Sequence, residues 1–317
     1  MLAVDVHQHL WPVEVLRALE RRATAPCATS TAAGWRLELP GEPAFLVDPA
    51  EHDVAIRTAA LRAAGLDRAL VALSSPIGIE ALPADEAAPV LAAWQRAASA
   101  LPTEFGWWGA VPLAAPADEL IAAADSALDA GAAGVVVGAG ALATPDGLQR
   151  LDRLLDRLQE RFAPLFVHPG PAPWTRPDVA VNADWWAPTT RYVAELHAAW
   201  HAWAGWGRAR HPRLRVLWAA LAGLAPLHAE RTALRGGPSP PAGPDPLAFY
   251  DTSGYGPRAL RWMAGAVGTS QLVHGTDAPV VATPAGGYGP APYAAAELGA
   301  GAHRALLTHN VARLLGT

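Results

Sequence analysis

The chain has 317 residues, of which 51% are hydrophobic, and its formal net charge is −5. This length suits one large domain or two ordinary ones, and neither the net charge nor any basic run suggests a nucleic-acid partner. No apolar run approaches the roughly 18 residues that a membrane-spanning helix needs, and the N-terminus lacks the pattern of a signal peptide. We therefore expect no membrane partner and a location in the cytoplasm.

Two residue counts narrow the chemistry. The single cysteine, Cys27, excludes an internal disulfide framework and fits a reducing compartment. Lysine is absent, so all 24 basic side chains are arginines. Mechanisms that use a lysine Schiff base, a P-loop lysine or a carbamylated lysine between two metals are therefore excluded.

Taken in chain order, eight short runs rich in Val, Leu, Ala and aromatic residues predict β-strands. They are Ala3–Leu10, Arg68–Ser74, Phe105–Val111, Gly134–Gly138, Pro164–His168, Leu214–Leu221, Ala248–Thr252 and Gln271–Asp277. The runs are apolar at almost every position, as expected for parallel strands that are buried on both faces.

Stretches with helical spacing separate most of these runs. In the clearest of them, Thr144 and Pro145 suit the N-cap and the first turn, and leucines then recur at helical intervals. Other helices are expected over Asp53–Ala64, Pro89–Ala100, Ala117–Ala130, Thr190–Trp203 and His309–Leu315, the last capped by Thr308 and ended by Gly316. The alternation predicts a (β/α)8 barrel, an α/β fold that spans residues 1–317 as one domain, with a doubly wound open sheet as the alternative.

Two segments interrupt the alternation. Pro169–Pro212 is predicted to be a long insertion after the fifth strand, and Gly236–Pro246 is predicted to be a mobile loop. Neither side of that loop looks complete without the other, so we do not expect a domain boundary there.

Three predicted strands end in side chains that can bind a metal. His7 and His9 alternate along the first strand and so share one face. His168 ends the fifth strand and Asp277 ends the eighth. Because such strand ends surround one axis in a barrel, three imidazoles and a carboxylate suit a single divalent metal, with zinc expected first and manganese, iron or cobalt as alternatives. The plainer interpretation is that His168 bonds loop backbone and Asp277 caps a turn.

The motifs around these residues resemble those of a known family. HQHL, FVHPG, GTDAP and the terminal HNVARLLG are similar to motifs of the amidohydrolase superfamily, and within it of the amidohydrolase-related group that includes aminocarboxymuconate-semialdehyde decarboxylase. FGWWGAVPL and LRVLWAALAG extend the resemblance over essentially the whole chain. The resemblance implies that His7, His9, His168 and Asp277 bind one metal. A mononuclear site is expected, because the chain has no lysine to bridge a second metal.

One position departs from that group. There the sixth strand usually ends in a histidine that activates water at the metal or moves protons at the substrate, whereas Ala220 stands in its place here. Metal coordination lowers the pKa of water by itself, so hydrolysis assisted by Asp277 should tolerate this exchange better than decarboxylation. His228, on an expected helix, and His274, which should face largely away from Asp277, are not expected to be ligands.

Three functions remain. The first is a metal-dependent hydrolase, with Asp277 as its catalytic residue, that opens an amide, ester or lactone of a small cyclic or aromatic substrate. The second is a nonoxidative decarboxylase of an aromatic or enol acid, which is a carbon–carbon lyase. The third is a degenerate barrel that keeps the metal and has lost its chemistry. The residues favour the first, and a homodimer is possible because related barrels often dimerise.

Thirteen tryptophans are many for a chain of this length. Trp11, Trp174 and Trp186, with Trp185 beside the last, are expected to form the wall of a pocket for a flat small-molecule substrate. Tryptophans on helices more often stabilise the packing of the protein, so we assign no role in substrate binding to the remaining tryptophans.

Arginines and two further histidines complete the candidates. Arg176, Arg191 and Arg258 are candidates for holding a substrate carboxylate, although a surface charge is the plainer interpretation for each. His197 and His201 have the spacing of a metal pair on a helix, but no acidic ligand accompanies them, so we expect no metal there.

Overall fold

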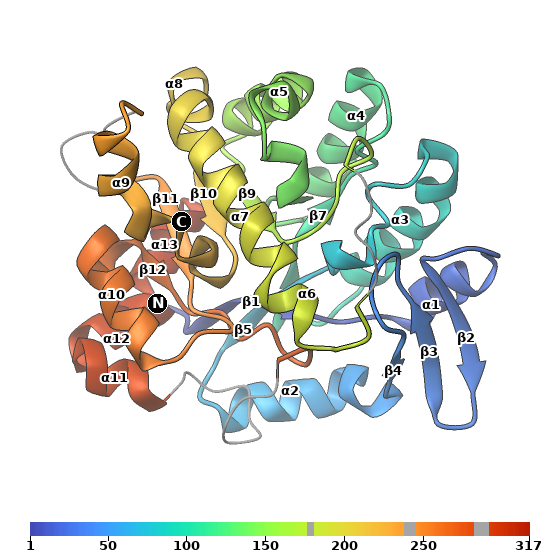
Figure 1. Ribbon diagram of the computed structural model, residues 1–317. Helices are drawn as coiled ribbons and strands as arrows, with labels where there is room; N and C mark the ends of the chain where they lie inside the picture. The colour runs from blue at the N-terminus through green and yellow to red at the C-terminus, as the bar shows by residue number, and fades with distance from the viewer. Residues whose placement is uncertain (176–180, 238–244, 282–291) are drawn as a thin grey trace.

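The computed structural model describes residues 1–175, 181–237, 245–281 and 292–317. Its centre is a barrel of parallel strands surrounded by helices, so the predicted (β/α)8 architecture is confirmed (Figure 1). The barrel strands are β1 (Val4–His9), β5 (Arg68–Ala72), β6 (Phe105–Trp107), β7 (Gly109–Ala110), β8 (Val135–Gly138), β9 (Leu165–His168), β10 (Val216–Trp218), β11 (Ala248–Asp251) and β12 (Leu272–Val273). Every apolar run predicted to be a strand contains at least one of them.

The third position in the barrel is a strand interrupted at Trp108. Its first part, β6, pairs with β5, and its second part, β7, pairs with β8. The backbone N–H of Trp108 donates to the Val71 carbonyl at 2.9 Å, so the chain stays attached to the sheet through the interruption.

The barrel closes between β1 and the segment that follows β12. The backbone N–H of Val6 donates to the His274 carbonyl at 2.9 Å, and Gln8 forms a parallel bridge with Ala278. The regular strand β12 ends well before Asp277, so the predicted eighth strand is shorter than expected. The residues beyond it nevertheless continue along β1 and belong to the barrel wall.

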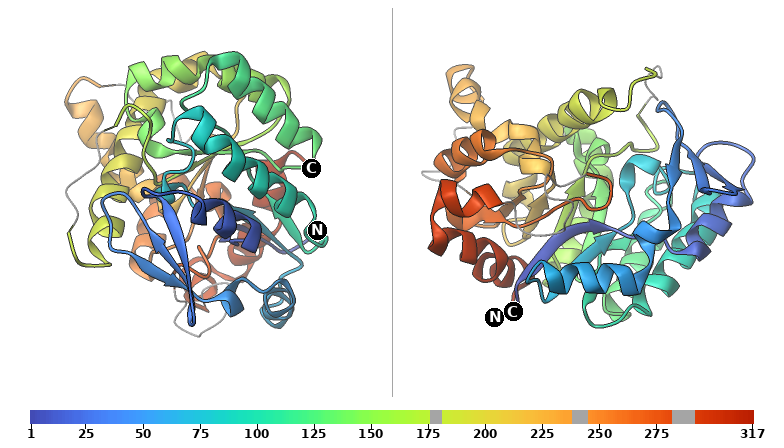
Figure 2. Two further views of the ribbon diagram at one scale, coloured as in Figure 1. Left: turned by 90° about the vertical axis from the view of Figure 1, so that its right-hand side faces the viewer. Right: turned by 90° about the horizontal axis from the view of Figure 1, so that it is seen from below.

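Helices cover the outside of the barrel (Figures 1 and 2). The α-helices are α1 (Val13–Glu20), α2 (Val54–Ala63), α3 (Ala84–Ser99), α4 (Ala117–Asp129), α5 (Pro145–Glu160), α6 (Trp186–Thr189), α7 (Arg191–Ala202), α8 (Arg208–Arg210), α9 (Ala229–Leu234), α10 (Pro257–Val267), α11 (Pro292–Leu298), α12 (Ala300–Leu307) and α13 (His309–Leu315). Shorter turns are η1 (Pro49–His52), η2 (Ser75–Ile77), η3 (Ala139–Leu142), η5 (Ala220–His228), η6 (Thr269–Gln271) and the π-helical η4 (Trp203–Gly207). Within the described ranges, no helix has the length and apolar character to cross a bilayer.

Some of the predicted helix boundaries and caps are confirmed, and others are wrong. The Thr144 hydroxyl accepts a hydrogen bond from the Gly147 N–H at 3.1 Å, which confirms the cap of α5. Helix α3 begins at Ala84 and contains Pro89, which lacks one backbone hydrogen bond without ending the helix. The expected cap of α13 is wrong, because the Thr308 hydroxyl donates backward to the Arg304 carbonyl.

A small antiparallel sheet was not predicted. It consists of β2 (Cys27–Thr31), β3 (Gly34–Glu38) and β4 (Phe45–Val47), and it lies outside the ring of helices (Figure 2). Leu37 and Val47 are buried in one cluster with residues of α1 and α3, which fixes the sheet on the barrel. The predicted insertion after the fifth strand contains α6, α7, η4 and α8. Most of the predicted loop Gly236–Pro246 lies outside the described residues.

Side chains fill the interior of the barrel. Val6, Trp108 and Phe166 are almost fully buried there, in one cluster with Val311 and Leu314 of α13. The Trp108 indole donates to the Val6 carbonyl at 3.0 Å, which ties the third strand to the first across the interior. The interior is therefore a packed core, so a substrate can enter only from one end.

Glu80 is a buried carboxyl group beneath η2. It is 2% exposed, Ser75 Oγ donates to its Oε1 at 2.7 Å, and its Oε2 has no hydrogen-bond partner among the described residues. Burial raises the pKa of Glu80 from 4.5 to about 7. The folded state therefore holds this proton more tightly than the unfolded chain, and stability falls as pH rises from 4.5 toward 7.

We predict that Glu80→Gln removes this part of the pH dependence. Between pH 5 and pH 8 the Glu80 carboxyl should cost the wild type about 2–3 kcal/mol of unfolding free energy, whereas the amide cannot ionise. Urea denaturation at both pH values measures the difference, with Glu119→Gln on the exposed face of α4 as the control. The same loss in wild type and Glu80→Gln would show that Glu80 is not the group responsible.

Candidate metal centre

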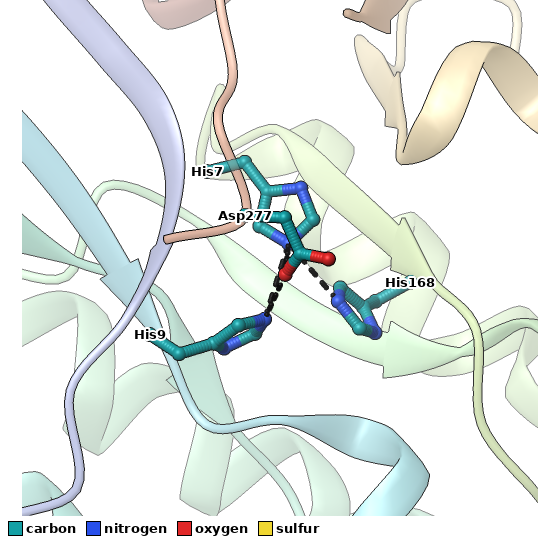
Figure 3. A group of neighbouring side chains, drawn as sticks. All are labelled: His7, His9, His168 and Asp277. Carbon is teal, nitrogen blue, oxygen red and sulfur yellow. Dashed lines mark hydrogen bonds and ion pairs between the residues drawn. The ribbon is translucent and has the colours of Figure 1, made fainter. Parts of the chain in front are cut away.

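Four side chains from three distant parts of the sequence meet at one end of the barrel (Figure 3). Nε2 of His7 lies 3.2 Å from Nε2 of His9 and 3.0 Å from Nε2 of His168. Oδ1 of Asp277 lies 2.8 Å from Nε2 of His9 and 3.3 Å from Nε2 of His7. One donor atom of each side chain lies within 4.8 Å of all the others. The structure thus brings together all four residues that the sequence grouped.

An irregularity in β1 aims both histidines at this point. The pairing of β1 with β5 gains one residue between Asp5 and Gln8, so the simple alternation of faces breaks there. Val6 and His7 both lie within this irregularity. Val6 belongs to the interior cluster, and His7 contacts Phe166 of the same interior, with the ring centroids 5.0 Å apart. The extra residue therefore turns the His7 and His9 pair toward the barrel axis.

Each of the three imidazoles is held at its other nitrogen. Nδ1 of His7 lies 2.8 Å from Asp251 Oδ2. Nδ1 of His9 lies 3.0 Å from the Ala72 carbonyl oxygen, and Nδ1 of His168 lies 2.9 Å from the Pro169 carbonyl oxygen. Carboxylate and carbonyl oxygens only accept, so each Nδ1 carries a hydrogen, and in the neutral ring each Nε2 presents a lone pair. The three nitrogens converge on a point where a cation could bind all of them.

The carboxylate completes a set of donors that fits one divalent metal. Asp277 Oδ1 is buried, and its polar neighbours are the Nε2 atoms of His9 and His7. Three imidazole nitrogens and one carboxylate oxygen suit zinc, manganese, iron or cobalt, and the absence of thiolates leaves the choice among them open.

The electrostatics of the centre also call for a positive charge. Burial lowers the pKa of His7, but the carboxylates of Asp251 and Asp277 outweigh it and raise this pKa to about 10. Burial and the neighbouring histidines hold the pKa of His168 well below its ordinary value. Although burial opposes it, the charge of His7 and the hydrogen bonds of His7 and His9 lower the pKa of Asp277. A metal ion would replace the proton that His7 otherwise keeps.

A hydrogen-bond network fixes Asp277 against β1. Asp277 has a left-handed backbone with φ of 59°, a conformation that costs about 1–2 kcal/mol in residues other than glycine. Its N–H donates to the His7 carbonyl at 2.8 Å. The buried guanidinium of Arg57 donates to the carbonyls of His9 at 2.8 Å and Ala278 at 3.4 Å. Arg57 thus joins the strand of the two histidines to the loop of the carboxylate.

Asp251 orients His7 from the end of β11. Besides the His7 Nδ1–H, its carboxylate accepts from the Ala220 N–H at 3.1 Å and from the Ser253 N–H at 2.9 Å. The Ala220 N–H reaches it because residues 220–224 form a left-handed turn, with φ between 46° and 67°. Four of these five residues are not glycine, so the turn is strained, as is common beside functional sites.

A cavity of about 850 Å³ opens above the four donor side chains. His7, His168 and Asp277 form part of its wall, together with Trp11 and His52. Most of the remaining wall is apolar, and the stretch after β10, where Ala220 lies, contributes only Ala, Gly and Leu side chains. No described residue in this stretch replaces the missing strand-6 histidine.

The structure separates the predicted pocket residues. Trp11 lines the cavity, while its role in binding a substrate stays a proposal. Trp174 does not, because its ring packs under Arg150 and lines another hollow near Leu113. Trp186 begins α6 and is 43% exposed, outside the cavity wall. Arg176 lies outside the described residues.

The other candidate cations and histidines lie elsewhere. The guanidinium of Arg191 pairs with Glu42, and Arg258 is exposed at the start of α10. His197 Nε2 bonds the Gly223 carbonyl at 2.7 Å, and its ring packs against those of His201 and His228. His274 is buried with Nε2 4.0 Å from Asp5 Oδ2. Within the described chain, none of these histidines joins the donor cluster.

Sequence reasoning missed Asp251, Arg57 and His52. Asp251 ends a predicted strand in the same way as His168, so its position was a signal that could have been used. Arg57 lies on a helix whose apolar pattern is weak, and nothing in the sequence marks it as buried. His52 follows the unpredicted sheet, so its place beside β1 could not be foreseen.

Solved structures with the same architecture cover nearly the whole chain. IDCase from Metarhizium anisopliae, in its apo form, has a TM-score of 0.81 and 20% identity, with 99% of this chain and 97% of that chain aligned. For 2,6-dihydroxybenzoate decarboxylase from Rhizobium the TM-score is 0.69 and the identity 17%, over 100% and 99% of the two chains. The fold is that of the amidohydrolase barrels.

A third amidohydrolase-type barrel was solved with a metal. It is 5-carboxyvanillate decarboxylase from Novosphingobium aromaticivorans complexed with manganese and 4-hydroxy-3-methoxy-5-nitrobenzoic acid, with a TM-score of 0.68 and 16% identity over 100% of this chain and 96% of that one. No protein-family model and no curated protein matches the chain. At these identities the likeness establishes the fold, and at that level it confirms the resemblance found in the motifs.

We predict that Asp251→Asn weakens metal binding. An amide holds the His7 Nδ1–H less strongly than a carboxylate, so the affinity for zinc should fall about 10- to 100-fold. Competition with a chromophoric chelator measures the dissociation constant. Asp118→Asn, at a side chain that is 84% exposed, provides the same chemical change far from the site. If Asp251→Asn binds zinc as tightly as this control, Asp251 does not support the centre.

Proposed function

We propose that this chain is a metal-dependent, nonoxidative decarboxylase of a small aromatic or otherwise conjugated carboxylic acid. The observation that carries the proposal is the donor set of His7, His9, His168 and Asp277 facing a mostly apolar cavity. Barrels of the same fold include decarboxylases of 2,6-dihydroxybenzoate and 5-carboxyvanillate, the latter solved with manganese. These likenesses favour decarboxylation over the hydrolysis that the sequence suggested.

The reaction needs one bond broken and one proton delivered. The bond between the ring carbon and the carboxylate carbon breaks, its electron pair stays on the ring carbon, and this carbon takes up a proton as CO2 leaves. A metal held by the four ligands would supply the positive charge that orients the acid. Asp277 both reaches the donor cluster and lines the cavity, so we assign it the relay of this proton, which it would take from a water molecule in the cavity and pass to the ring carbon.

The cavity wall suits a flat substrate. Trp11, Phe45 and Ile77 belong to the same cavity wall as His7 and His168. An aromatic ring can pack against such a surface while its carboxylate is directed to the metal centre. The volume of about 850 Å³ admits a single ring with substituents.

Hydrolysis is the second candidate, and Ala220 is the observation that favours it. The wall after β10 holds no described side chain that could relay a proton, and hydrolysis at a metal depends less on such a group than decarboxylation does. A lactone or cyclic amide would then be the substrate class, again with Asp277 as the acid–base residue.

We predict that the metal-loaded protein releases CO2 from aromatic monocarboxylic acids such as 2,6-dihydroxybenzoate. Replacing the acid–base group in Asp277→Asn should lower kcat by about 10²- to 10⁴-fold. Product formation is followed by liquid chromatography alongside a panel of lactones and cyclic amides, and metal content is measured for each variant.

The control separates loss of the proton relay from loss of the metal. Asp118→Asn should keep full activity, and Asp277→Asn is compared at a metal concentration that saturates it. Hydrolysis of a lactone or amide without CO2 release from any acid would favour the second candidate. Full activity of saturated Asp277→Asn would contradict the role given to Asp277 in both.

A further inference from the structure

The described wall of the cavity carries negative charge but no cationic side chain other than histidine. Its carboxyl groups are Glu42, Glu51, Asp184 and Asp277. No arginine is among the described lining residues, and the chain contains no lysine. The sequence outside the described ranges contains one arginine, Arg176. An anionic group of a substrate thus finds one strong partner in this wall, the metal centre.

The guanidinium of Arg191, which reaches a carboxylate of this wall, is already paired. The Arg191 guanidinium pairs with Glu42, and Tyr192 Oη donates to the two carboxylate oxygens of Glu42 at 2.8 and 2.9 Å. The Glu42 side chain is 11% exposed, so the pair is largely shielded from water. A second substrate carboxylate would have to approach Glu42 without a free cation to receive it, and an unpaired charge in such surroundings is costly.

His52 offers a neutral hydrogen-bond donor to the same cavity. Its Nδ1 accepts from the Trp11 backbone N–H at 3.1 Å, and its ring stacks on the Trp11 indole with the centroids 4.8 Å apart. An Nδ1 that accepts carries no hydrogen, so the hydrogen of the neutral ring is on Nε2. His52 is 9% exposed and lines the cavity, and no protein acceptor for Nε2 occurs among the described residues.

The surroundings of His52 keep its ring uncharged. Burial lowers the pKa of His52 to about 3, and the charge of Arg57 and the neighbouring His9 ring lower it further. At neutral pH the ring therefore recognises a substrate by donating a hydrogen bond rather than by its charge. A ligand that accepts from this N–H in place of water is preferred to a ligand that displaces the water without supplying an acceptor.

We infer that the substrate carries a single carboxylate, is otherwise uncharged, and accepts a hydrogen bond from His52 Nε2. The inference rests on the proposed function only in placing the carboxylate at the metal centre. It assigns His52 to substrate recognition and excludes aromatic dicarboxylates from the substrate class.

Four small acids of matched shape test the inference on the zinc-loaded protein by calorimetry. Benzoate carries one carboxylate, and pyridine-3- and pyridine-4-carboxylate add a ring acceptor at two positions. Benzene-1,3-dicarboxylate adds a second charge. At pH 8 the dicarboxylate should bind at least about tenfold more weakly than benzoate, because its second charge is unpaired. At least one pyridine acid should bind about three- to tenfold more tightly than benzoate.

Two variants of His52 separate recognition from folding. In His52→Asn the Oδ1 can replace Nδ1 as acceptor of the Trp11 N–H, but no donor reaches the position of Nε2. In His52→Gln the amide nitrogen reaches that position. We expect His52→Asn to lose the preference for the pyridine acid over benzoate, with both acids measured in the same variant. His52→Gln should keep most of that preference.

The outcomes are decisive for the inference. It is overturned if the dicarboxylate binds as tightly as benzoate, if His52→Asn keeps the preference for the pyridine acid, or if none of the four acids binds. Loss of the preference in both variants would also contradict it, because the donor position would then not matter. Release of CO2 is measured separately, so a protein that decarboxylates an acid but binds dicarboxylates keeps the proposed function and loses only this inference.

Discussion

The convergence of three imidazole lone pairs and one carboxylate oxygen is the constraint on which the site depends. Nε2 atoms 3.0 and 3.2 Å apart repel one another unless a positive charge lies between them. The protein holds them there because each Nδ1 donates to an acceptor. In addition, Arg57 donates to carbonyls of both β1 and the Asp277 loop and so links the two segments. Much of the surrounding architecture therefore serves to keep mutually repulsive groups together for a cation.

This constraint also shapes what the cavity can recognise. With acidic side chains and no arginine in the described wall, a metal held by the four donors would be the point that attracts an anion. His52 adds a directional contact without adding charge, because burial and Arg57 keep it neutral. The left-handed turn at residues 220–224 contributes no ionisable group, and it supports the centre only through the Ala220 N–H on Asp251. The proposed proton transfer by Asp277 and the proposed recognition of the substrate by His52 thus involve different parts of the cavity wall.

The sequence predicted the strands and the four donor residues because both follow local rules. Buried parallel strands are apolar throughout, and ligands at their ends point to one axis. The supporting residues follow no such rule. Arg57 is buried by contacts with His9 and Ala278, which are distant in sequence, and the antiparallel sheet that precedes His52 packs through scattered positions such as Leu37. Trp174 and Trp186 are of the residue type expected in the wall of a pocket. The direction of a loop side chain, however, is set by tertiary contacts that the sequence does not reveal.

The most direct test of the account is a crystal structure of the zinc-loaded protein with anomalous data at the zinc edge. We expect one zinc peak, with Nε2 of His7, His9 and His168 and a carboxylate oxygen of Asp277 each at about 2.0–2.2 Å. A zinc ion bound elsewhere, or a peak that lacks Asp277 or one of the three histidines as a ligand, would contradict the central claim.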